Sequence, residues 1–138
     1  MEKRLHTPVM LTEVLEYLNL SPGKIILDAT TGIGGHSFQI AERIAKKGRL
    51  ICIDRDQESL VVAKERLSQF KDACEFIYGN FIDMDNMLKK LNIKKVDGIL
   101  FDLGTSSFQL NDPQRGFSFQ AEGPLDMRLD RNSYISAY

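Results

Sequence analysis

The chain has 138 residues, enough for about one domain, and 43% of them are hydrophobic, which suffices for a buried core. Eighteen basic and nineteen acidic residues give a net charge of −1, so the composition alone does not indicate nucleic-acid binding. The first residues lack the apolar core of a signal peptide, and no apolar run has the length of a membrane span. We therefore expect a cytoplasmic protein with no membrane partner. Cys52 and Cys74 lack metal-type spacing, so we expect buried, reduced thiols and no metal site.

The apolar periodicity predicts helices that alternate with short strands along the chain. Helical spacing of apolar residues predicts helices at residues 11–18, 35–45, 56–70 and 83–91. Short apolar runs predict strands at residues 25–28, 50–54, 75–78 and 98–101. We expect Asp56 and Asp83 to begin the third and fourth helices, and Gly48 to end the second. This alternation is typical of an α/β protein with a parallel sheet and right-handed crossovers.

Residues suited to ligand binding stand where each predicted strand ends. Asp28, Asp54 and Asp102 end the first, second and fourth strands, and the pair 80–81 (Asn-Phe) follows the third. Ligands of open α/β sheets bind beyond the carboxyl ends of the strands. We therefore expect these four groups to meet at one site.

The glycine-rich loop after the first strand indicates the class of ligand. It runs from Asp28 through Gly32 and Gly34, and the acid Asp54 follows twenty residues later, as expected for a residue that binds ribose hydroxyls. A dinucleotide fingerprint needs a third glycine where this chain has Ser37. The acid four residues before Gly32 instead resembles motif I of S-adenosylmethionine-dependent methyltransferases. A dinucleotide-dependent oxidoreductase is the disfavoured alternative among enzymes.

Further motifs lie after the fourth strand and at the N-terminus. They read DLGTSSFQL at 102–110, RGFSF at 115–119, GPLDMR at 123–128, H-x-P at 6–8 and GGH at 34–36. Together they closely resemble the bacterial small-subunit ribosomal RNA (cytosine-N4) methyltransferase family, over essentially the whole chain. The resemblance implies S-adenosyl-L-methionine as the cofactor, the small ribosomal subunit RNA as the partner, and N4 of a cytosine as the methylated atom.

The resemblance also implies a set of site residues. Its cofactor-binding positions correspond here to Gly34, Gly35, His36, Asp54, Phe81, Asp102 and Gln109. In the family, Asp54 binds the ribose, Phe81 lies against the adenine, and Asp102 and Gln109 lie around the methionine end and the methyl-transfer site. Three positions depart from the pattern: Thr31 and Ile33 replace an apolar residue and a glycine, and Phe108 replaces a frequent proline. These departures concern loop detail, because they leave the ligand positions intact.

The implied reaction makes demands on the site. Cytosine N4 is a poor nucleophile, so the enzyme has to hold the amine near the methyl group and accept hydrogen bonds from it. Asp102 is the candidate catalytic residue, and a role in cofactor binding alone stays open. The target base also has to leave its stack to reach the site.

Structural interpretations stay open for several of these residues. Asp28 can serve only to stabilise the glycine loop, and Phe81 can be a core residue. The segments 115–119 and 125–128 can pack within the protein rather than contact RNA. His6 is a weak candidate for the active site.

Methyltransferase sheets of the class that the chain resembles have seven strands in the order 3-2-1-4-5-7-6, and this chain supplies the first four. We therefore expect the N-terminal half of a Rossmann-like methyltransferase fold, with a four-stranded sheet in the order 3-2-1-4. Residues 1–103 are expected to form a partial cofactor-binding domain. Residues 104–138 are expected to form a loop and the start of a helical insertion, with a helix beginning at 133–138.

Two further expectations follow from this half sheet. A non-catalytic nucleotide-binding or interaction module is the alternative function, because a partial fold need not be active. The fourth strand lacks a neighbour on one side, so we expect a homo-oligomer built around this exposed sheet edge.

Overall fold

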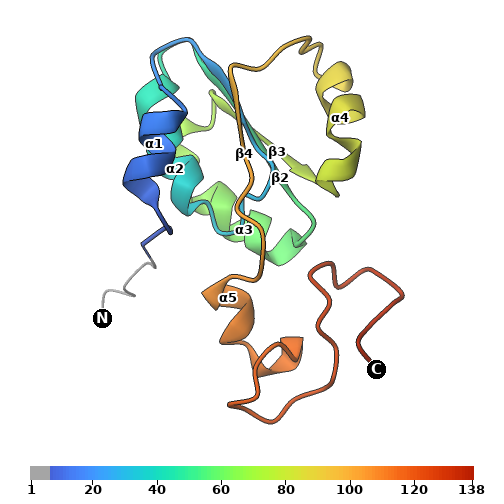
Figure 1. Cartoon of the computed structure of the whole chain (residues 1–138). Helices are drawn as coiled ribbons and strands as arrows, with labels where there is room; N and C mark the ends of the chain where they lie inside the picture. The colour runs from blue at the N-terminus through green and yellow to red at the C-terminus, as the bar shows by residue number, and fades with distance from the viewer. Residues whose placement is uncertain (1–6) are drawn as a thin grey trace.

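The computed structural model describes residues 7–138, so His6 lies outside the described residues. Four strands form one parallel sheet in the order β3-β2-β1-β4 (Figure 1). The strands are β1 (Ile25–Asp28), β2 (Arg49–Asp54), β3 (Cys74–Tyr78) and β4 (Gly98–Leu100). The predicted strand order 3-2-1-4 is confirmed.

The helices predicted at 11–18, 35–45, 56–70 and 83–91 are present, the first before β1 and the others between strands. The α-helices are α1 (Leu11–Tyr17), α2 (Gly35–Ile44), α3 (Gln57–Arg66), α4 (Met84–Lys90) and α5 (Ser107–Leu110). Short 3-10 helices are η1 (Ser68–Phe70), η2 (Phe81–Asp83) and η3 (Pro113–Arg115). Figure 1 shows α1, α2 and α3 on one face of the sheet and α4 on the other.

Each face of the sheet has its own core cluster, which is why the strands are apolar on both sides. On the first face, Ile26, Leu50 and Cys52 pack against Ile40 and Ile44 of α2. The second cluster consists of Leu27, Ile51, Ile53 and Ile93 with side chains of α4, including Met84, Met87 and Leu88. Both cysteines are free and buried, as expected.

One helix end differs from the sequence prediction, and another agrees with it in position but not in its hydrogen bonding. Lys47, not Gly48, adopts the left-handed conformation after α2, with φ 67°. Glycine is needed at position 48 for another reason: a Cβ there would lie 2.2 Å from the carbonyl oxygen of Ile44. Asp83 is the N-cap of α4, as predicted, but its side chain makes no cap hydrogen bond. Asn80 supplies the local cap instead, since its side chain accepts from the Ile82 N–H at the start of η2.

The expected helix at 133–138 is wrong, because these residues form no helix. Their backbone groups bond to the preceding loop rather than along a helix. The carbonyl of Ser133 accepts from Arg128, and the N–H of Ala137 donates to the carbonyl of Asp126. Tyr134, Ile135 and Tyr138 are exposed, so a helix here would have no apolar face to bury.

The segment 104–138 lies beyond the carboxyl ends of the strands, below the sheet in Figure 1. It is attached at the side of α3 and β3. Arg115 pairs with Asp56, Arg131 with Glu58, and the Tyr78 hydroxyl donates to Asp130. These contacts lie on the α3 and β3 side of the sheet, away from β4.

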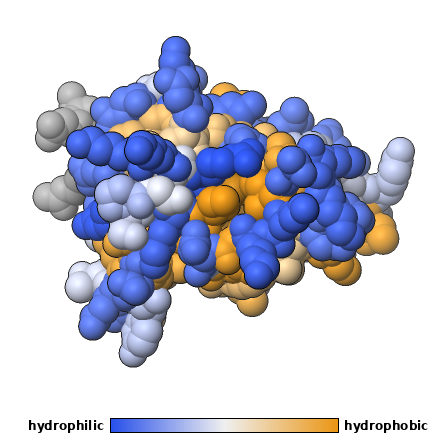
Figure 2. Space-filling view, turned by 90° about the horizontal axis from the view of Figure 1, so that it is seen from above, coloured by the Kyte–Doolittle hydropathy of each residue, from blue (hydrophilic) through white to orange (hydrophobic). Residues whose placement is uncertain are grey.

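The described part of the sheet ends at β4, which pairs with β1 alone. Ile99, Phe101 and Leu103 are 40%, 44% and 71% exposed along or just after this strand. Figure 2 views the molecule from the amino ends of the strands and shows apolar side chains exposed among polar ones near its middle. Within residues 7–138, no helix is long and apolar enough to cross a membrane.

Candidate cofactor site

A cleft of about 460 Å³ opens at the carboxyl ends of the four strands. Its walls come from the loops that follow β1, β2, β3 and β4, together with the N-terminal segment at Pro8 and Val9. Of the predicted site residues, Gly35, His36, Asp54, Phe81, Asp102 and Gln109 line it. The sequence expectation that the strand ends meet at one site is therefore confirmed for Asp54, Phe81 and Asp102.

Asp28 is buried under the glycine loop, stabilises it by hydrogen bonds, and does not line the cleft. Its carboxylate accepts from the Thr30 N–H at 3.2 Å and from the Ser37 hydroxyl at 2.6 Å. Burial raises the pKa of Asp28 to about 6, against the lowering effect of the Ser37 hydrogen bond. The structure thus supports the loop-stabilising interpretation of Asp28.

The two adjacent glycines of the loop face different surroundings. Gly34 is the N-cap of α2, in the left-handed conformation, and a Cβ there would lie 2.7 Å from Cδ1 of Leu67. It packs against α3 and does not line the cleft, whereas Gly35 does. No side chain caps α2. The N–H groups of its first turn therefore need an acceptor, and a helix N-terminus favours an anionic one.

Asp54 is held in place by two backbone N–H groups. Its Oδ2 accepts from Gly32 at 2.7 Å and its Oδ1 from Asp56 at 2.8 Å. Burial raises the pKa of Asp54 above its usual value, while these two hydrogen bonds act in the lowering direction. A carboxylate has about four acceptor positions, so both oxygens can still accept from ligand hydroxyls.

Phe81 provides an aromatic surface next to the acid. Its ring packs edge-on against Phe101, with centroids 5.4 Å apart and an interplanar angle of 81°. Phe81 lines the cleft just after β3, so one face of the cleft at this strand end is aromatic. A flat, apolar ligand group fits such a surface.

Asp102 lies just after β4 and carries the carboxylate nearest to His36. The distance from Asp102 Oδ2 to His36 Nδ1 is 3.8 Å, and the Asp102 side chain is 44% exposed. The Asp102 N–H donates to the Thr30 hydroxyl at 2.6 Å, which ties the two strand ends together. Nε2 of His36 lies 2.8 Å from the Val9 carbonyl, which can only accept, so this nitrogen carries a proton.

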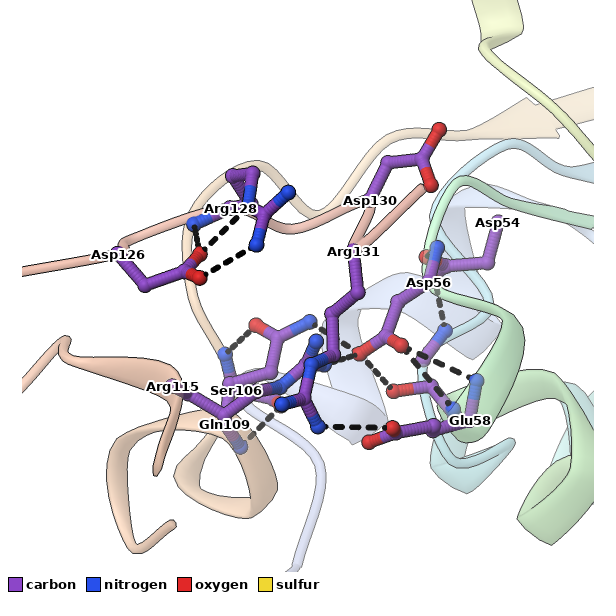
Figure 3. A network of polar contacts seen from close by, with 12 residues as sticks. Asp54, Asp56, Glu58, Ser106, Gln109, Arg115, Asp126, Arg128, Asp130 and Arg131 are labelled. Carbon is purple, nitrogen blue, oxygen red and sulfur yellow. Dashed lines mark hydrogen bonds and ion pairs between the residues drawn. The ribbon is translucent and has the colours of Figure 1, made fainter. Parts of the chain in front are cut away.

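Gln109 lines the cleft but also belongs to a buried polar network (Figure 3). Its Oε1 accepts from the Ser106 N–H at 3.0 Å, and its Nε2 donates to Asp56 Oδ2 at 2.9 Å. Arg115 forms an ion pair with the same Asp56 oxygen, and the two side chains are 1% and 2% exposed. Through this network the segment 104–138 is bonded directly to the N-cap of α3, two residues after Asp54.

The network was missed by the sequence analysis. Asp56 was predicted only as a helix cap, which it is, accepting from the Glu58 and Ser59 N–H groups. Arg115 lies 59 residues after Asp56 in the sequence, and no local pattern indicates that the two residues pair. The cleft residues Arg55, Arg66 and Thr30 were likewise not predicted.

Comparison with known proteins identifies the family. The sequence matches the MraW methylase family over residues 3–138. The chain belongs to this family. It is 49% identical over 132 residues to ribosomal RNA small subunit methyltransferase H of Finegoldia magna, covering 96% of this chain and 42% of that protein. The protein of the same name from Dictyoglomus thermophilum is 49% identical over 134 residues, with 96% and 45% covered. The chain thus spans less than half the length of these curated MraW relatives.

Solved structures support the fold of this MraW family member. A protein from Clostridium thermocellum superimposes with a TM-score of 0.63 at 21% identity, covering 73% of this chain and 54% of that one. An rRNA methylase from Streptococcus thermophilus superimposes with a TM-score of 0.57 at 22% identity, covering 76% and 58%. The Rossmann-like methyltransferase fold is confirmed.

Proposed function

We propose that the chain forms the cofactor-binding part of an S-adenosylmethionine-dependent methyltransferase that modifies N4 of a cytosine in small-subunit ribosomal RNA. The observation that carries the proposal is the cleft at the strand ends, in a chain that belongs to a methylase family. The names of the curated relatives support ribosomal RNA as the substrate class. The N4 position rests on the motifs that follow β4. Such a reaction belongs in the cytoplasm, where bacterial ribosomal subunits are made.

The residues of the cleft fit S-adenosylmethionine. A volume of about 460 Å³ lies in the range of small-molecule sites. Asp54 would accept from the ribose hydroxyls, and Phe81 would lie against the adenine. The uncapped first turn of α2, with Gly35, would bind the carboxylate of the methionine end. The buried Nη1 of Arg66, which lacks a partner among residues 7–138, also fits an anionic ligand group at this cleft.

In this proposal Asp102 acts on the substrate amine. The bound cofactor supplies an electrophilic methyl group on a positively charged sulfur. Asp102 is partly exposed in the cleft just after β4, so its carboxylate can accept a hydrogen bond from the amine and hold the amine in position. It can also stabilise the positive charge that develops on nitrogen, and accept the proton that nitrogen then loses.

Ligand titration tests this proposal. Calorimetry of the 138-residue chain should show binding of S-adenosylhomocysteine, the product form of the cofactor, and no binding of NADH. Binding of NADH alone would favour the dinucleotide alternative and contradict the proposal. The absence of heat with either ligand at millimolar concentration would contradict cofactor binding by this chain.

Catalysis by the chain alone is a separate question, because it spans 42–45% of the relatives' length. A non-catalytic nucleotide-binding module remains the second candidate function. Transfer of tritiated methyl groups to assembled small subunits distinguishes the two. Incorporation into RNA would exclude the non-catalytic candidate, whereas cofactor binding without incorporation would favour it.

A further inference from the structure

Arg66 is a charged side chain in the cleft that the sequence analysis did not predict as a site residue. It is the last residue of α3, and it lines the cleft beside Pro8 and Gly35. A Cβ built at Gly35 would lie 3.7 Å from Nη1 of Arg66, so the guanidinium lies close to the first turn of α2.

One nitrogen of the Arg66 guanidinium is buried without a partner, although the side chain as a whole is only partly buried. Nη1 of Arg66 is buried without a hydrogen bond, and none of the ion pairs within residues 7–138 includes this residue. Burial lowers the pKa of the Arg66 guanidinium, but arginine stays charged in proteins. A buried charged donor without an acceptor is costly, so an anionic ligand group would stabilise this position.

The first turn of α2 adds a second set of donors at the same place. This helix has ten residues, and its N-cap Gly34 has no side chain to accept from the first N–H groups. Those N–H groups and the helix dipole favour an anion. The cleft therefore combines a helix N-terminus on α2 with a cation on α3 that has no partner among the described residues.

Resting on the proposed function, we infer that Arg66 binds the carboxylate of the methionine end of S-adenosylmethionine, together with the first turn of α2. The carboxylate is the only anionic group of that cofactor. Its ammonium and sulfonium groups are cationic and are repelled by a guanidinium. Arg66 therefore makes the site specific for a cofactor that retains its carboxylate.

The test compares S-adenosylmethionine with its decarboxylated form, which lacks only the carboxylate. Affinities for the 138-residue chain are measured by calorimetry, or by competition with S-adenosylhomocysteine where binding is weak. We expect Arg66→Gln to weaken binding of S-adenosylmethionine roughly 10- to 100-fold, as for a lost charge-assisted hydrogen bond. The same variant should change the affinity for the decarboxylated form less than about threefold, because that ligand has no carboxylate for Arg66 to bind.

Two further variants complete the test. Arg66→Lys retains the charge and should recover part of the affinity for S-adenosylmethionine. Arg43→Gln removes an arginine on α2 that bonds Gln39 and does not line the cleft, so it should change neither affinity. Unfolding midpoints of all variants should match the wild type within a few degrees.

The failures of the two proposals are distinguishable. An equal loss of affinity for both ligands in Arg66→Gln would mean that Arg66 acts through the fold, and would overturn the inference. Unchanged binding of S-adenosylmethionine would overturn it as well, while leaving the proposed function standing. Failure of the wild type to bind S-adenosylmethionine at all would overturn both.

Discussion

At the scale of single residues, Asp54 is the clearest test of the cofactor site. Its carboxylate lies at the end of β2, lines the cleft and retains free acceptor positions. Asp54→Ala should weaken binding of S-adenosylhomocysteine by about 1–3 kcal/mol, through the loss of hydrogen bonds to a charged acceptor. Calorimetric titration measures this loss. Asp85→Ala, which removes an exposed carboxylate on α4, is the matched control and should leave the affinity unchanged.

The buried carboxylate of Asp28 makes stability depend on pH. Burial raises its pKa in the folded state from 3.8 to about 6. A raised pKa means that the folded protein binds the proton more tightly than the unfolded chain. The contribution of Asp28 to stability is therefore complete below pH 4 and is lost as the pH rises through 6. A shift of this size corresponds to about 3 kcal/mol.

Asp28→Asn should remove this dependence, since the amide is isosteric and does not titrate. We expect the free energy of unfolding of the variant to gain about 3 kcal/mol relative to the wild type between pH 4 and pH 7. Urea unfolding at several pH values measures the difference. A difference that stays constant across this range would contradict the raised pKa.

At the scale of elements, the pair of Asp56 and Arg115 connects the segment 104–138 to the start of α3. Both side chains are almost fully buried, so removing one partner leaves an uncompensated charge in the protein interior. Arg115→Met should therefore destabilise the protein by about 3–5 kcal/mol. It should also speed proteolysis within residues 104–138, and weaken cofactor binding because Gln109 shares the Asp56 oxygen.

The matched control for this variant is Arg131→Met. Arg131 pairs with Glu58 between the same two parts of the chain, but these side chains are 41% and 48% exposed. An exposed ion pair contributes less than about 1 kcal/mol, so this variant should behave nearly as the wild type. Equal effects of the two variants would show that burial of the Asp56 pair has no special importance.

The same pair shows how far the sequence could predict this structure. Local patterns were sufficient for β1, for the cap of α3 at Asp56 and for the strand-end acids, because periodicity and helix caps act over a few residues. The partner of Asp56 was not predictable, since ion pairing between distant residues leaves no local pattern. The prediction of a helix at 133–138 was wrong for a related reason. The backbone of these residues bonds to residues 126 and 128, and only the folded chain brings these two segments together.

At the scale of the whole molecule, the uncovered side of β4 determines how the chain should behave in solution. Apolar side chains at Ile99, Phe101 and Leu103 are exposed beside an unpaired strand edge. The segment 104–138 attaches at the opposite side, to α3 and β3. Among residues 7–138, no strand pairs with the outer edge of β4. An apolar strand with unpaired N–H and C=O groups is a template for another chain.

We therefore expect self-association through this edge at micromolar concentration, as a dimer or a larger assembly. Light scattering after size exclusion gives the mass directly. Ile99→Lys places a charge on β4 and should shift the chain toward the monomer, because a charged residue on an edge strand opposes pairing. Val61→Lys is the control, since Val61 is exposed on α3, which packs against β2 and β3 and not against β4. A wild-type chain that elutes as a monomer would refute this prediction, and an equal effect of both lysine variants would place the interface elsewhere.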